Sequence, residues 1–97
     1  MFHVDLAAVR AAFDDQMRRR MPPGPDATVE RAERVTRVLA LDGTWAAVVW
    51  SDLGGTDADA VIAAETARDT PYLEWKHYSG DRPDDLPERL AAAGLVA

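Results

Sequence analysis

Hydrophobic residues in the first quarter of the chain recur every three or four positions, which is the spacing of one side of an α-helix. This spacing predicts a helix over residues 5–21, with Asp5 as the residue whose carboxylate caps the first turn. The proline-rich residues 22–25 end the helix, because proline lacks the amide hydrogen and clashes with the preceding turn. The residues on the apolar side are Phe2, Leu6, Val9, Phe13 and Met17.

The middle of the chain has the composition of β-strands. Residues 28–31 start a short edge strand, and residues 35–41, which are rich in β-branched and aliphatic side chains, form a second strand. The dipeptide Asp42-Gly43 is a strong hairpin signal, and it precedes a third segment at residues 45–51. That segment is apolar at almost every position, as expected of a central strand covered on both sides. We therefore expect three consecutive antiparallel strands.

A helix and a fourth strand follow. Residues 57–68 are rich in alanine, which favours helix, and Thr56 or Asp57 can cap them. Residues 72–78 alternate in the manner of a strand. On that strand Leu73, Trp75 and His77 should share one side, and Glu74, Lys76 and Tyr78 the other.

The last expected element is a helix over residues 84–93. Residues 85–88 resemble a capping box, with proline tolerated in the first turn. Gly94 suits the left-handed position after a helix, and Leu95 suits the hydrophobic contact that accompanies it. The residues expected to face inward are Leu86, Leu90 and Ala93.

These elements follow the order α-β-β-β-α-β-α within a single domain that spans residues 1–97. We expect a mixed α/β (α+β) fold built on a four-stranded mixed sheet. A strand–helix–strand unit is right-handed and joins parallel strands, so the last two strands should be parallel. The earlier strand pairs should be antiparallel.

Charge and cysteine content narrow the functional classes. A net charge of −6 argues against nucleic-acid binding, because an acidic surface repels phosphates. The chain has no cysteine, which excludes disulfides and zinc–thiolate sites. It has no signal-peptide pattern and no apolar run near ~18 residues, so we expect a cytoplasmic location and no membrane contact. We interpret the basic run at residues 18–20 as a solvated helix end rather than an anion site.

Several segments together resemble a known family. Residues 45–53, 57–65, 74–78 and 81–94 resemble the N-terminal half of actinobacterial acetyltransferases of the GNAT superfamily, and residues 12–19 resemble their opening helix. Such proteins carry a degenerate GNAT-like lobe first and a catalytic lobe second. The resemblance implies a non-catalytic lobe whose partner is a catalytic GNAT lobe, an acyltransferase that uses acetyl-CoA.

In that superfamily a glycine-rich loop between a strand and a helix holds the cofactor's pyrophosphate on backbone amides. The matching residues 52–59 contain the loop candidates Gly54 and Gly55, but no basic residue. Their three aspartates would repel a diphosphate, so we interpret the glycines as a turn and expect no bound cofactor. The helix over 84–93 also lacks the family's general-acid tyrosine, so we assign no catalytic residue.

The other polar residues suggest no separate chemistry. Glu74 and His77 should lie on opposite faces of their strand, and we expect His77 to be a partly buried structural residue. His3 lies near the start of the chain, and no spacing pairs the two histidines, so we expect no metal site. The carboxylates expected to cap helices or face solvent are Asp14, Asp15, Asp57, Asp59, Asp81, Asp84 and Asp85.

Three tryptophans fall on the expected central strands, where core packing is the simplest role: Trp45, Trp50 and Trp75. If exposed, Trp50 and Trp75 would mark an interaction surface together with Tyr78, because interfaces favour aromatic residues. The fourth strand should leave one sheet edge open, and open edges recruit partners or a second copy of the chain.

Three functions remain open at this stage. The first is a GNAT-like scaffold lobe that forms one wall of the substrate cleft of an N-acetyltransferase. The second is a stand-alone interaction module that dimerises or binds a protein through the open sheet edge. The third is an autonomous small acyltransferase with an atypical cofactor loop.

Overall fold

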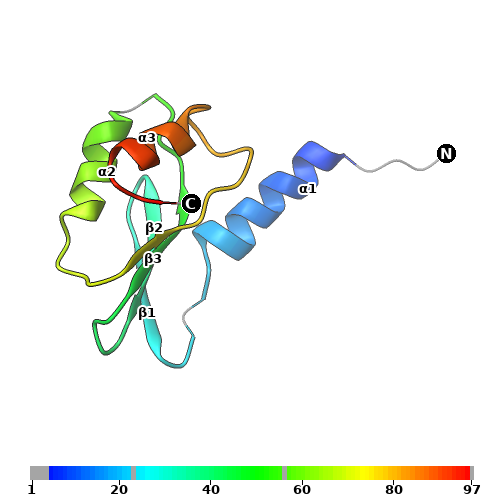
Figure 1. The fold of residues 1–97 in the computed structure, drawn as a ribbon. Helices are drawn as coiled ribbons and strands as arrows, with labels where there is room; N and C mark the ends of the chain where they lie inside the picture. Colours follow the sequence, from blue (N-terminus) through cyan, green and yellow to red (C-terminus); the bar gives the residue numbers. More distant parts are fainter. Residues whose placement is uncertain (1–4, 23, 56, 97) are drawn as a thin grey trace.

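The computed structural model describes residues 5–22, 24–55 and 57–96, so Phe2, His3 and Thr56 lie outside the described residues. The elements follow the predicted order (Figure 1). They are α1 (Leu6–Phe13), the π-helical segment η1 (Asp14–Arg19), β1 (Ala27–Arg31), β2 (Val35–Ala40), β3 (Ala46–Ser51), α2 (Ala58–Thr66), β4 (Leu73–Trp75) and α3 (Leu86–Ala92).

The four strands form one mixed sheet in the order β1-β2-β3-β4. The first three strands are antiparallel neighbours, whereas β3 and β4 are parallel, with Ala46 opposite Leu73 and Val48 opposite Trp75. The predicted mixed sheet and its parallel last pair are therefore confirmed. Gly43 turns the chain between β2 and β3 at a φ of 75°, a conformation that costs glycine little because it has no Cβ.

Helices α2 and α3 lie together on one face of the sheet and enclose the main core (Figure 1). That core comprises Val35, Val48, Leu53, Ala58, Ile62, Leu86 and Leu90, with Val61, Leu73, Trp75 and Leu95 packed against it. The opposite face carries a smaller cluster of Val38, Ala47 and Val49, against which Met21, Ala27 and Val29 pack. Strand β3 is thus apolar on both faces, as its composition predicts.

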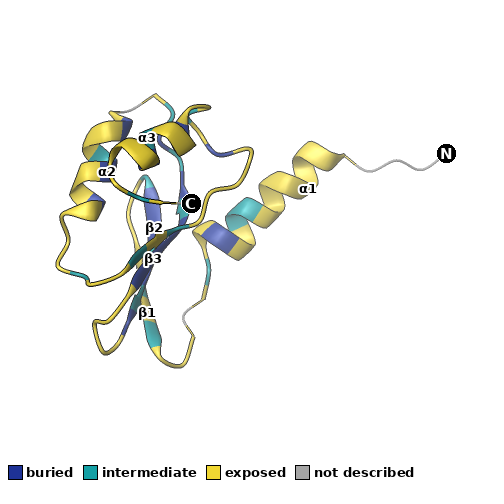
Figure 2. Ribbon diagram, in the orientation of Figure 1, coloured by how far each residue is buried: buried dark blue, intermediate teal, exposed yellow. Residues whose placement is uncertain are grey.

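Helix α1 begins as predicted but projects away from the sheet (Figure 2). Asp5 caps it, since its Oδ1 accepts hydrogen bonds from the amides of Ala7 at 3.1 Å and Ala8 at 3.2 Å. The apolar side has the expected spacing, yet it is not covered: Leu6 is 74% exposed and Met17 is 62% exposed. The predicted helix also widens at Asp14 into the π-helical turns of η1.

Strand β4 is shorter than the predicted 72–78 segment, because pairing with β3 ends at Trp75 and Lys76. Leu73 and Trp75 do pack against the main core. His77 lies beyond the strand and is exposed, so the expectation of a partly buried structural histidine is wrong.

Helix α3 confirms its predicted C-terminus but not its N-terminal cap. Gly94 adopts a φ of 101°, and the Leu95 amide donates to the Leu90 carbonyl at 3.1 Å. The capping box is wrong, because Asp85 Oδ1 accepts from Arg89 Nε at 2.9 Å rather than from a backbone amide of the described helix. Leu86 and Leu90 face the core as expected, whereas Ala93 is exposed and corrects that prediction.

The core predicts a large penalty for Ile62→Ala. Ile62 is 1% exposed within the cluster that joins α2 to the sheet. Its truncation should lower the free energy of unfolding by about 2–5 kcal/mol, measured by urea denaturation. Leu41→Ala removes a residue that is 66% exposed and should change that free energy by no more than about 0.5 kcal/mol. Equal losses in the two variants would contradict this core assignment.

Candidate functional site

A buried arginine lies where η1 meets the sheet. Arg18 is 3% exposed, and its guanidinium forms a two-pronged ion pair with Asp81, in which Nη1–Oδ1 and Nη2–Oδ2 are both 2.8 Å. Arg18 also donates to the Val49 carbonyl at 2.9 Å, to Asp14 Oδ1 at 3.1 Å and to the Lys76 carbonyl at 3.3 Å. The interpretation of residue 18 as a solvated helix end is therefore wrong, and so is the expectation that Asp81 caps a helix or faces solvent.

The surroundings of Arg18 favour its charged form. Burial alone would lower the pKa of Arg18, but hydrogen bonds and charges from Asp81 and Asp14 outweigh burial and raise this pKa. The Tyr78 ring lies under the guanidinium, with its centroid 4.0 Å from Cζ, and the Tyr78 amide donates to Asp81 Oδ2 at 3.1 Å. Phe13 packs against the same ring, with 5.9 Å between ring centroids.

The other two residues of the basic run are exposed, as expected. Arg19 lies over the Trp50 ring at 4.9 Å from its centroid, and the Arg19 carbonyl accepts from the Thr36 hydroxyl at 2.8 Å. Arg20 pairs with Asp15 at 2.6 Å on the surface. Such an exposed pair contributes little to stability.

The strand-to-helix corner after β3 is a turn, as its two glycines predict. Gly55 has a φ of 73°, and the Gly54 amide donates to Asp52 Oδ1 at 3.3 Å. Asp57 caps α2 by accepting from the Ala60 amide at 3.1 Å. Two backbone amides of this corner are thus already paired with carboxylates of the same segment.

Two arginines from the part of the chain after β4 reach the corner, and the sequence analysis predicted neither contact. Arg82 lies against Gly54 so closely that an added Cβ would be 2.9 Å from Arg82 Nε. Arg89 of α3 pairs with Asp59 at 3.0 Å and with Asp85 at 2.9 Å, and these contacts raise the pKa of Arg89. The corner therefore has basic neighbours, but Arg89 is already engaged by carboxylates.

A second buried ion pair joins the sheet to α2. Arg37 of β2 donates through Nε to Glu65 Oε2 at 3.0 Å, and its Nη2 pairs with Oε1. Hydrogen bonding to Glu65 raises the pKa of Arg37 against the opposing effect of burial. Glu65 is 5% exposed. A charged residue in the middle of the apolar segment 35–40 was the available signal for this pair.

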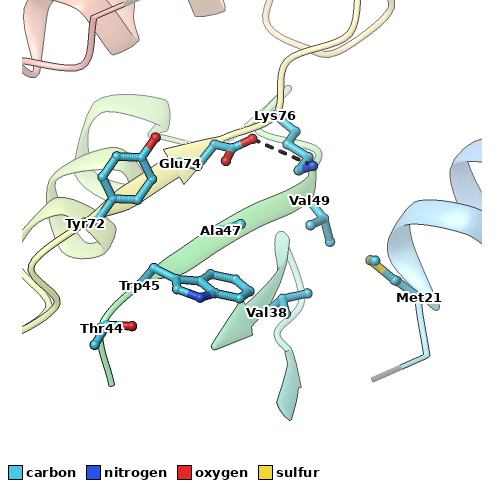
Figure 3. A pocket seen from close by; sticks show the side chains of 9 residues that line it. All are labelled: Met21, Val38, Thr44, Trp45, Ala47, Val49, Tyr72, Glu74 and Lys76. Atoms are coloured by element: carbon cyan, nitrogen blue, oxygen red, sulfur yellow. Dashed lines mark ion pairs between the residues drawn. The ribbon is translucent and has the colours of Figure 1, made fainter. Parts of the chain in front are cut away.

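The less covered sheet face contains a hollow of about 500 Å³, which we call the sheet-face hollow (Figure 3). Trp45 and Tyr72 lie along it, and they are 39% and 61% exposed. Glu74 and Lys76 form an ion pair at its rim, with 3.7 Å between Oε1 and Nζ. The expected core role of Trp45 is therefore wrong. The lining residues are Met21, Val38, Thr44, Trp45, Ala47, Val49, Tyr72, Glu74 and Lys76.

Of the three aromatic residues proposed from sequence as one interaction surface, Trp50 and Tyr78 both contact arginines of η1, whereas Trp75 lies on the core side of the sheet. Trp50 is half-buried under Arg19, and Tyr78 is 43% exposed beside Arg18. Trp75 packs against the main core, and its buried Nε1 has no hydrogen-bond partner among the described residues.

Within the described part of the chain, no three histidine, aspartate or glutamate side chains gather closely enough to hold a metal ion. None of the described helices has the length and apolar character needed to cross a bilayer. Comparison with protein-family models, curated proteins and solved structures finds no match for this chain.

The buried pair predicts unequal effects for the two carboxylates that hold Arg18. Asp81→Asn removes the charge that faces both guanidinium nitrogens and leaves a buried cation poorly compensated, so it should cost about 3–5 kcal/mol in urea denaturation. Asp14→Asn removes a carboxylate that is 33% exposed and should cost about 0.5 kcal/mol. A loss below about 1 kcal/mol for Asp81→Asn would contradict the anchoring role of this pair.

Proposed function

We propose that this chain is a non-catalytic GNAT-like lobe that serves as a scaffold and as one wall of the substrate cleft of an acetyl-CoA-dependent N-acetyltransferase. The observation that carries the proposal is the hydrogen bonding at the corner between β3 and α2. Its own aspartates accept hydrogen bonds from the Gly54 and Ala60 amides. A diphosphate seated at a strand-to-helix corner would need amides of this kind.

Electrostatics at the corner point the same way. A diphosphate there would lie beside Asp52, Asp57 and Asp59, and two like charges 4 Å apart repel by ~1 kcal/mol even in water. Arg82 is the basic side chain nearest to Gly54, while Arg89 is engaged by Asp59 and Asp85. Arg82 alone would have to offset both the repulsion from these carboxylates and the free energy lost when the diphosphate leaves water.

The composition of α3 and the shape of the sheet support a scaffold role. Helix α3 has the sequence LPERLAA and offers no tyrosine as a proton donor. Helices α2 and α3 cover one sheet face, while the sheet-face hollow with Trp45 and Tyr72 leaves a concave apolar wall on the other. A concave apolar surface with a few polar groups is the usual form of a substrate-cleft wall. The cytoplasm is the proposed location, where acetyl-CoA would serve the partner lobe.

Calorimetric titration of the chain with acetyl-CoA tests the proposal directly. We expect no saturable heat up to about 1 mM ligand at ~0.15 M salt, because the Gly54 and Ala60 amides are paired with carboxylates and the local charge is negative. An acetylation assay on a panel of amines should likewise show no turnover by the chain alone.

Gly54→Ala serves as the matched variant. Its new Cβ would lie 2.9 Å from Arg82 Nε and would displace the basic side chain nearest to this corner glycine. Micromolar binding of acetyl-CoA that is lost in Gly54→Ala would overturn the proposal, because it would place the cofactor on this loop.

A further inference from the structure

The outer edge of β4 carries unpaired backbone groups. The Ala46 amide donates to the Tyr72 carbonyl at 2.9 Å, and the Lys76 amide donates to the Val48 carbonyl at 2.9 Å. The backbone groups of Tyr72 and Lys76 therefore point toward β3. Backbone groups alternate in direction along a strand. Leu73 and Trp75 therefore present their amides and carbonyls to the other side, where no described strand lies.

A hollow that no described residue fills lies beside this edge. This hollow of about 480 Å³ lies between β4 and α3, lined by Trp75, Pro87 and Leu90 among others. The segment after α3 borders the hollow without pairing with β4, since the Leu95 amide donates to Leu90. An extended strand can reach the edge, and such edges are templates for pairing with another chain.

We propose that the occupant of this edge is β4 of a second copy of the chain, paired antiparallel across a two-fold axis that passes beside Trp75. The two sheets would then join into one continuous sheet, and Trp75 would lie opposite Trp75 of the second copy. This interface goes beyond the proposed scaffold function and does not depend on it.

Charge favours this register over the two neighbouring registers that the backbone allows. Hydrogen bonding requires that Leu73 and Trp75 face outward-pointing residues of the second strand. With Trp75 opposite Trp75, Glu74 lies opposite Lys76 of the second copy, and the same pair recurs by symmetry. If one strand shifts along the other to the next register that keeps the hydrogen bonds, like charges meet. A shift in one direction places Glu74 opposite Glu74 of the second copy, and a shift in the other direction places Lys76 opposite Lys76. Like charges directly opposite each other destabilise a sheet, whereas opposite charges stabilise it.

The side chains that would form these pairs are available. Glu74 and Lys76 are each about half exposed, at 50% and 48%, and their mutual contact is 3.7 Å within one chain. They would occupy the non-hydrogen-bonded positions of the new pair, where facing side chains come closest. An exposed ion pair of this kind adds little to stability. Replacing the Glu74–Lys76 contact within each chain by contacts between the two chains therefore costs little free energy.

The other sheet edge lacks these features. On β1, Glu30 is already paired with Arg37 and Arg68, each at 3.0 Å. Arg31 donates to the Met21 carbonyl at 2.7 Å. The charged residues of β1 are thus engaged within the chain, whereas β4 offers a self-complementary pair.

Sedimentation velocity from about 5 to 500 µM protein tests the interface, since mass action makes dimerisation concentration-dependent. Wild type should convert from monomer to dimer over this range. Glu74→Lys and Lys76→Glu each replace attraction by repulsion at both symmetric positions, so each should raise the dimer Kd about tenfold or more. The double variant E74K/K76E restores opposite charges and should return the Kd to within about threefold of wild type.

Glu33→Lys is the matched control for Glu74→Lys, because it changes the net charge by the same amount and in the same direction at an exposed residue away from β4. It should leave the Kd within about threefold of wild type. Circular dichroism should show that the single variants remain folded. A wild type that stays monomeric throughout, or a dimer that the single reversals leave intact, would overturn the proposal.

Cysteine cross-linking tests the register itself, because the natural chain has no cysteine. In the proposed register the Cα atoms at positions 74 and 76 of opposite chains are about 4.5 Å apart, within disulfide range. A mixture of Glu74→Cys and Lys76→Cys chains should therefore form a disulfide-linked heterodimer on oxidation. Efficient cross-linking of Glu74→Cys with itself, and not with Lys76→Cys, would contradict this register.

Discussion

The structure depends on one buried guanidinium. Arg18 carries its charge into the junction of η1, β3 and the turn after β4, where Asp81 pairs with both of its terminal nitrogens. A buried charge is expensive unless it is paired and its remaining hydrogen bonds are satisfied. The Val49 and Lys76 carbonyls and Asp14 supply the remaining partners. The pair thus ties the N-terminal helical segment to residues more than sixty positions away.

This anchor explains the uneven covering of the sheet. It fixes η1 at one end of the less covered face, so α1 continues outward and leaves Leu6 and Val9 exposed (Figure 2). At the corner after β3 the Gly54 and Ala60 amides are paired with carboxylates, whereas the outer edge of β4 and the sheet-face hollow are not covered by described residues. The proposed cleft wall and the proposed dimer edge both use these uncovered surfaces.

Local rules predicted most of the fold. Asp5 and Asp57 cap their helices and Gly94 takes the left-handed position, because each depends on a few neighbouring residues. The capping box at Asp85 failed because Arg89, one turn later, binds the same carboxylate. The end of β4 could not be predicted either, because alternation continues to Tyr78 whereas pairing depends on β3.

The candidate sites were harder to predict because they join distant residues. Nothing near Arg18 in the sequence distinguishes it from its neighbours Arg19 and Arg20, yet only Arg18 of the three is buried. Arg37 was the more visible case, because an arginine within an apolar strand requires a partner. The aspartates around Gly54 are visible in the sequence, so their effect on a diphosphate could be predicted. The contact of Arg82 with Gly54 could not be predicted, because it depends on the folding of a distant segment.

The side-chain nitrogen signals of the arginines, recorded by NMR at neutral pH, test the central claim most directly. If Arg18 is held as described, its Nε–H should exchange slowly with water and its Nη groups should rotate slowly, giving separate signals. The exposed Arg20 should give fast exchange and averaged signals. An Arg18 signal that exchanges and averages as Arg20 does would contradict the account.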